Sequence, residues 1–124
     1  MNTSRKGQCN ERFVRRLYES CGWTVELMRM SKGRGGYDFE AEGGRCVPWS
    51  SLSLLEVAEY AVTKHYVQVK SNAVGDARRK FQAAWDNGKN HDGLCVIAVV
   101  KDGGPHKPKT VKWEVWRARP AKEK

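Results

Sequence analysis

Residues 94–100 form a continuous apolar run, Leu-Cys-Val-Ile-Ala-Val-Val. A run of this length is typical of a β-strand that is covered on both faces, because a strand with one solvated face alternates between apolar and polar residues. The chain has 124 residues, of which 40% are hydrophobic, and a chain of this size buries about two-thirds of the surface that its unfolded form exposes. We therefore expect one compact domain over residues 1–124, with this strand inside it.

The first third of the chain predicts a helix followed by a β-hairpin. Apolar side chains recur over residues 8–21 at the spacing of one helix face. Residues 23–30 and 37–42 are rich in strand-forming residues, and the glycine-rich stretch between them interrupts the two strands. We expect these strands to pair as a hairpin.

The rest of the chain predicts an insertion and four further elements. Residues 43–63 form the insertion, in which residues 52–61 are compatible with a short helix, although a strand remains an open alternative. The later elements are a strand over 64–70, a helix over 74–87, strands over 94–100 and 110–119, and a frayed tail over 120–124. This alternation of helices and strands predicts a layered α/β domain.

The charge distribution indicates a polyanionic partner. The chain carries 23 Lys and Arg against 14 Asp and Glu, a net charge of +9. Strongly basic small domains bind nucleic acids by neutralising phosphates. The segment from 37 to 71 is nevertheless acidic, and carboxylates repel phosphate unless a cation lies between them, so this contrast favours a metal. The alternative is that the basic residues only keep the protein soluble.

The sequence contains no feature of a membrane protein. No stretch approaches the roughly 20 apolar residues of a membrane span, and the first residues lack the apolar segment of a signal peptide. The four cysteines show no Cys-x-x-Cys spacing, so we expect reduced thiols rather than a structural zinc site. We expect a soluble protein of the cytoplasm.

Asp38, Gln68 and Lys70 form the candidate catalytic group. Gln68 and Lys70 are two positions apart in the strand predicted over 64–70, so they share one face. If that strand pairs with the strand that carries Asp38, then an aspartate, an amide oxygen and an ammonium group converge. From spacing alone, a solvated strand face remains the alternative.

This convergence suits hydrolysis of phosphodiester bonds. The Asp38 carboxylate, the Gln68 amide oxygen and the Val69 carbonyl are hard oxygen ligands for Mg²⁺ or Mn²⁺. Such an ion polarises a phosphate and activates a bound water. Lys70 would position that water or stabilise charge on the phosphoryl oxygens. Glu11, in the first predicted helix, is a candidate further metal ligand or proton acceptor.

Four parts of the sequence together resemble a known family. They are Glu11, an Arg-x-Ser segment at 29–31, Gly-Tyr-Asp-Phe-Glu-Ala at 36–41 and Val-Gln-Val-Lys-Ser at 67–71. In this order they resemble the PD-(D/E)xK nuclease superfamily, and most closely the archaeal-type Holliday-junction resolvases, which also occur in phages. The resemblance covers most of residues 7–87.

The resemblance implies a restriction-endonuclease-like fold, in which helices flank a mixed sheet, and a Mg²⁺-dependent endonuclease. It implies that Glu11, Asp38, Gln68 and Lys70 are the active-site residues, joined by Ser31 from the glycine-rich loop. The implied substrate is DNA, in particular four-way junctions, which a homodimer would cut with one active site for each of two strands. The protein would act in recombination and repair, in the host cytoplasm if a phage encodes it.

The sequence departs from the family at three places, of which Tyr37, where a proline is common, has little chemical consequence. Gln68 stands where a second acid is usual, so the site keeps an oxygen ligand but has one negative charge fewer. The insertion at 43–63 lengthens the connection from Asp38 to Gln68. Glutamine at this position is similar to Mrr-type restriction nucleases. Two alternatives stay open: a restriction-type or other structure-specific nuclease, and a catalytically silent DNA-binding module of the same fold.

Basic and hydroxyl side chains near these positions are candidate contacts to the DNA backbone. The glycine-rich loop would close over the backbone, and the helix cations would track it on either side. The alternative for the helix cations is a solvated face. The candidates are Arg12, Arg15, Arg16, Arg29, Ser31, Lys32, Arg34, Ser71, Arg78, Arg79 and Lys80.

Overall fold

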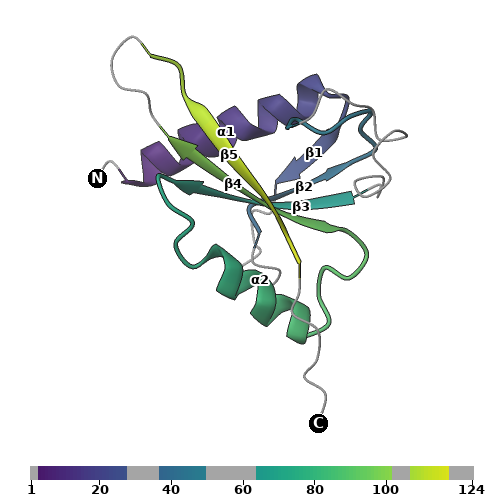
Figure 1. The fold of residues 1–124 in the computed structure, drawn as a ribbon. Coiled ribbons are helices and arrows are strands. Elements are labelled where there is room, and N and C mark those ends of the chain that lie inside the picture. Colours follow the sequence, from purple (N-terminus) through teal and green to yellow (C-terminus); the bar gives the residue numbers. More distant parts are fainter. Residues whose placement is uncertain (1–2, 28–36, 50–63, 102–106, 118–124) are drawn as a thin grey trace.

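The computed structural model describes residues 3–27, 37–49, 64–101 and 107–117. These residues form an α/β structure with two helices and five strands (Figure 1). The elements are α1 (Thr3–Ser20), β1 (Thr24–Leu27), β2 (Phe39–Glu42), β3 (Lys64–Ser71), α2 (Ala77–Asp86), β4 (Leu94–Lys101) and β5 (Thr110–Trp116). The predicted order of helices and strands is confirmed for this part of the chain.

The five strands form one mixed sheet in the order β1-β2-β3-β4-β5. β1 pairs with β2 and β2 with β3 in antiparallel fashion, so the predicted hairpin is present. β3 and β4 are parallel, with Val69 opposite Ala98, and β5 returns antiparallel to β4. Two parallel neighbours require a crossover connection, and α2 supplies it.

The helices cover opposite faces of the sheet (Figure 1). On the α1 face, a first core contains Val14, Tyr18, Phe39, Val67 and Val96 among its buried residues. On the α2 face, a second core consists of the buried residues Tyr66, Ala77, Phe81, Cys95, Ile97, Val99 and Trp116. β4 contributes alternate residues to both cores, which confirms that the apolar run at 94–100 is covered on both sides.

Several boundaries differ from the predicted ones. α1 begins at Thr3, five residues earlier than expected. α2 begins at Ala77 rather than at residue 74, because Gly75 has a φ of 59° and the Ala77 N–H closes a turn onto the Val74 carbonyl. β2 begins at Phe39, and Asp38 just before it still donates its N–H to the Val67 carbonyl at 2.8 Å.

The start of the predicted insertion packs against the first core. Val47 is buried, and the Trp23 indole donates to the Cys46 carbonyl at 2.6 Å. The short helix expected at 52–61 and the frayed tail at 120–124 lie outside the described residues. Neither described helix is long and apolar enough to cross a membrane.

Candidate active site

Asp38 lies where β3 extends beyond its partner strand. β2 begins at Phe39, opposite Val67, whereas β3 continues to Ser71. The Asp38 carboxylate provides a hydrogen-bond partner where β2 supplies none, since its Oδ2 accepts a hydrogen bond from the Val69 N–H at 2.7 Å. The N–H and C=O of one strand residue point to the same edge, so the Val69 carbonyl faces the side on which Asp38 lies.

Gln68 and Lys70 lie on the α2 face of β3, as the alternation predicts. They share this face with Tyr66, which belongs to the second core. Gln68 is only 3% exposed, whereas Lys70 is half-buried. The Lys70 ammonium donates to the Asp76 carboxylate at 2.8 Å. Lys70 therefore points to the turn that precedes α2.

Charge interactions connect Asp38 with Glu11 on α1 and with Lys70 on β3. Burial raises the pKa of Asp38 above its usual range, while the Val69 N–H and the charges of Lys70 and Lys80 oppose that rise. Burial also raises the pKa of Glu11, and the negative charge of Asp38 raises it further. The first helix and the strand edge thus hold two carboxylates that repel each other.

A cation between Glu11 and Asp38 would relieve the cost of burying the two carboxylates, and it would offset the negative charge of Asp38 that raises the pKa of Glu11. The described residues contain no group of three or more His, Cys, Asp or Glu side chains arranged for a metal. A divalent ion here would therefore rely on two carboxylates together with neutral oxygens. The Val69 carbonyl and the Gln68 amide are such donors, and the set suits Mg²⁺ or Mn²⁺, which prefer oxygen ligands.

Asp76 is a member of this site that the sequence reasoning did not single out. Besides Lys70, its carboxylate lies 3.5 Å from the Lys80 ammonium and 3.9 Å from the Arg79 guanidinium. The hydrogen bond from Lys70 lowers the pKa of Asp76, and nearby positive charge lowers it further. Asp76 occupies the N-cap position of α2 but makes no capping hydrogen bond with its side chain. An aspartate in the first turn of the helix predicted over 74–87 is the only signal that the sequence offered.

A buried asparagine links α1 to the end of β3. Asn10, next to Glu11, is 1% exposed. Its amide nitrogen donates to the Ser71 hydroxyl at 2.7 Å, and its amide oxygen accepts from Lys109 at 2.9 Å. Ser71, a candidate DNA contact, is thereby fixed beside Lys70.

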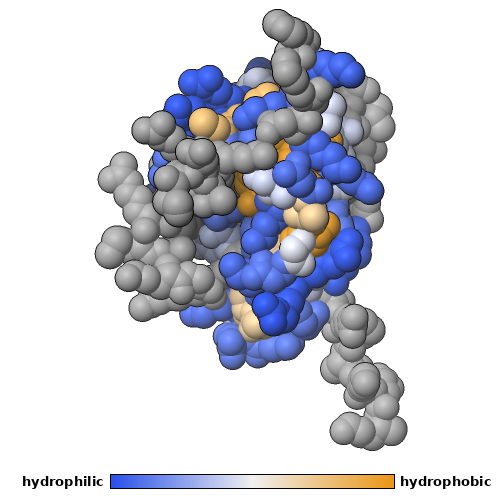
Figure 2. Space-filling view, turned by 90° about the vertical axis from the view of Figure 1, so that its left-hand side faces the viewer, coloured by the Kyte–Doolittle hydropathy of each residue, from blue (hydrophilic) through white to orange (hydrophobic). Residues whose placement is uncertain are grey.

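The candidate DNA-binding residues differ in their surroundings. Arg12 and Arg16 are exposed on α1, whereas the Arg15 Nε lies 3.7 Å from the Glu11 carboxylate. On the side of the molecule where β3 and β4 end, hydrophilic residues cover most of the described surface, with small hydrophobic patches between them (Figure 2). Four further candidates lie outside the described residues: Arg29, Ser31, Lys32 and Arg34.

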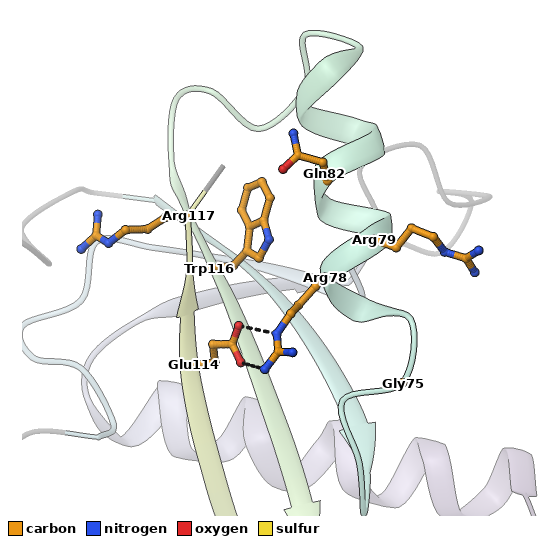
Figure 3. Close-up of a pocket in the computed structure, with 7 residues that line it drawn as sticks. All are labelled: Gly75, Arg78, Arg79, Gln82, Glu114, Trp116 and Arg117. Carbon is orange, nitrogen blue, oxygen red and sulfur yellow. Dashed lines mark hydrogen bonds and ion pairs between the residues drawn. The ribbon is translucent and has the colours of Figure 1, made fainter. Parts of the chain in front are cut away.

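Arg78 has a partner on β5. Its guanidinium makes two hydrogen bonds to the Glu114 carboxylate, at 2.8 and 2.7 Å, across a cavity of about 590 Å³ between α2 and β5 (Figure 3). Arg79 also lines this cavity, and its side chain extends away from the Arg78–Glu114 pair (Figure 3). Neither Asp38 nor Lys70 is among the lining residues. The Arg78 guanidinium uses two of its five N–H groups on Glu114, through Nε and Nη2.

Comparisons with protein-family models, with curated proteins and with solved structures found no match for this chain.

Proposed function

We propose that this protein is a divalent-metal-dependent DNA endonuclease of the PD-(D/E)xK type. The observation that carries the proposal is the placement of the Asp38 carboxylate on the Val69 N–H, where β3 continues past the start of β2. The charge of Lys70 opposes the rise in the pKa of Asp38, and the charge of Asp38 raises the pKa of Glu11. These interactions support a site to which residues far apart in the sequence would supply oxygen ligands and an ammonium group.

The architecture is compatible with the restriction-endonuclease-like fold that we propose for the chain. The mixed sheet has a helix on each face, and the candidate residues lie on α1, at the start of β2 and near the end of β3. The β3-α2-β4 crossover places α2 next to Lys70, where Asp76 contacts it.

The metal would be held by Asp38 and Glu11 together with the Val69 carbonyl and the Gln68 amide oxygen. Mg²⁺ or Mn²⁺ in this position would polarise the scissile phosphate and activate a water. A partly desolvated carboxylate with a raised pKa is also suited to take a proton, and Glu11 is such a group.

Lys70 would supply the positive charge that the reaction requires. Its ammonium would stabilise the negative charge that develops on the phosphoryl oxygens, or orient the attacking water. Asp76 fixes that ammonium with a 2.8 Å contact. Because Gln68 replaces an acid, the site has fewer negative charges than is usual for the family, and we expect it to bind its metal more weakly.

We propose four-way DNA junctions as the substrate and a symmetric homodimer as the active form, on the basis of the resemblance to Holliday-junction resolvases. Two-fold symmetry would bring one active site to each of the two strands that must be cut. Equal cleavage of linear duplex would instead favour a restriction-type nuclease.

The test is incubation of the purified protein with a synthetic four-way junction or a linear duplex, with Mg²⁺, Mn²⁺ or EDTA. Asp38→Asn and Lys70→Ala should each lose cleavage by at least about 100-fold while DNA binding in EDTA persists. Asp86→Asn is a matched control, because Asp86 is exposed near the end of α2 and accepts only from Gln82 among the described contacts. It should cleave like the wild type.

The replacement of an acid by Gln68 favours one second candidate, a DNA-binding module of the same fold without catalysis. That module would bind the junction or duplex in EDTA, and no divalent metal would produce cleavage. Asp38→Asn and Lys70→Ala would then behave like the wild type in every assay. Metal-dependent cleavage by the wild type excludes this candidate.

A further inference from the structure

A second cluster of positive charge lies on α1, outside the candidate active site. Residues of α1 and the segment before β5 enclose a hollow of about 250 Å³. Its lining residues are Cys9, Arg12, Phe13, Arg16 and Lys109. Among the described residues that line it, three are cationic and none is acidic, so this part of the hollow carries concentrated positive charge.

The arginines are arranged along the helix axis. Arg12 and Arg16 are four residues apart, which corresponds to about 6 Å along an α-helix and places both on one side. Both side chains are exposed. Within the described part of the chain, neither makes an ion pair, whereas Arg15 lies next to Glu11 on a neighbouring face. The charge of Arg12 and Arg16 is therefore available to an anion from outside.

Lys109 is held in position in this hollow. Its ammonium donates to the Asn10 amide oxygen at 2.9 Å and lies 5.7 Å from the centre of the Phe13 ring. Asn10 is itself anchored to Ser71 by a 2.7 Å hydrogen bond. A lysine that is fixed before binding loses less side-chain entropy when it contacts a phosphate.

Two hydrogen bonds and two sequence neighbours connect the hollow to the candidate active site. Asn10 precedes Glu11 in α1, and Ser71 follows Lys70 in β3. The contacts from Lys109 through Asn10 to Ser71 therefore fix the hollow relative to Lys70. Lys109 and Asn10 thus link the hollow directly to Ser71, the residue that follows Lys70.

We propose that this hollow binds the sugar-phosphate backbone of the DNA strand next to the cleaved phosphate. The identification of the polymer as DNA rests on the proposed function. The guanidinium groups of Arg12 and Arg16 and the ammonium of Lys109 contact consecutive phosphates. The Phe13 ring lies beneath the lysine ammonium. These contacts carry no sequence information and set the position of the strand.

The first test measures DNA binding without cleavage. Fluorescence anisotropy with a labelled duplex and a labelled four-way junction in EDTA gives the affinity over a series of salt concentrations. Arg12→Ala, Arg16→Ala and Lys109→Ala should each reduce the slope of log K against log salt by about 0.9, the value for one lost phosphate contact. Arg45→Ala is the control, because Arg45 is an exposed cation beyond the end of β2 and away from this hollow. It should leave the slope unchanged.

The second test uses the wild-type protein and does not depend on any variant. Cys9 is exposed in the hollow, whereas Cys46 lies in the segment after β2 and is half-buried. Bound duplex should slow alkylation of Cys9 by N-ethylmaleimide several-fold, measured by peptide mass spectrometry, and leave the rate at Cys46 unchanged. Unchanged alkylation of Cys9 at saturating DNA, together with unchanged salt slopes, would overturn the proposal.

The two proposals fail in different ways. Protection of Cys9 without cleavage in any metal would overturn the nuclease and support the backbone site. Metal-dependent cleavage without protection of Cys9, and with wild-type salt slopes in all three variants, would support the nuclease and overturn the backbone site.

Discussion

The Asp38 carboxylate accepts a hydrogen bond from the main-chain N–H of Val69 at 2.7 Å. This contact replaces a strand partner that β2 does not supply, and it leaves the second carboxylate oxygen of Asp38 outside that hydrogen bond. The Val69 carbonyl faces the same edge. The end of a strand pairing therefore creates a place where oxygen atoms from the main chain and a side chain gather.

We predict that Mg²⁺ or Mn²⁺ raises the thermal unfolding temperature of the wild type and fails to do so for Asp38→Asn. A ligand that binds only the folded state contributes about 2.7 kcal/mol at one hundred times its Kd, which corresponds to several degrees for a domain of this size. Differential scanning fluorimetry over a metal titration measures the shift. Asp86→Asn should respond like the wild type, and an equal response of Asp38→Asn would contradict the prediction.

We predict that Glu11→Gln changes the dependence of stability on pH. The pKa of Glu11 in the folded state is raised above its usual 4.5, by burial first and by the charge of Asp38 second. Folding therefore favours the protonated form, and stability falls as the pH rises from 4.5 through the folded-state pKa. Glu11→Gln removes this loss, so without metal the variant should become more stable than the wild type toward neutral pH.

Urea unfolding in EDTA between pH 4 and pH 7 measures this difference, which should vanish at the acid end. Glu19→Gln is a matched control on an exposed position of α1. A constant difference across the whole range would show that Glu11 is not desolvated at the site.

We predict that Tyr18→Phe destabilises the first core by about 1–3 kcal/mol, since the change withdraws one partner of a buried hydrogen bond. The Tyr18 hydroxyl and the His65 Nδ1 are 3.0 Å apart, and both side chains are fully buried. The midpoint of urea unfolding should fall with an unchanged slope. Tyr37→Phe is the control, because its hydroxyl contacts Glu40 in a half-buried place and its loss should cost about 1 kcal/mol or less. Equal losses in the two variants would refute the prediction.

Local patterns predicted the elements of the fold better than their ends. The period of two in β3 was enough to place Gln68 and Lys70 on one face, and the apolar run of β4 was enough to predict two covered faces. The start of α2 depends on the turn at Gly75, whose positive φ no periodicity reveals.

The contacts of the candidate site depend on tertiary packing. The charge of Asp38 acts on Glu11 because α1 packs on the sheet, and helix periodicity says nothing about that position. Arg78, a predicted DNA contact, also pairs with Glu114, which is 36 residues away on β5, and no local pattern indicates that pairing. Asp76 was overlooked because the start of a helix explains an aspartate without any partner.

We predict that Asp76 is a positioning residue for Lys70. Asp76→Asn removes the charge that holds the Lys70 ammonium at 2.8 Å, so the maximal cleavage rate should fall about tenfold, by analogy with the loss of supporting partners around catalytic groups. The DNA concentration at half-maximal rate should stay the same or decrease, since the substitution removes a negative charge near the phosphates. Steady-state kinetics of junction cleavage separate the two quantities. Asp76→Glu should recover part of the rate, and Asp86→Asn should match the wild type. A rise in KM at an unchanged kcat would mean that Asp76 shapes DNA binding and does not position Lys70.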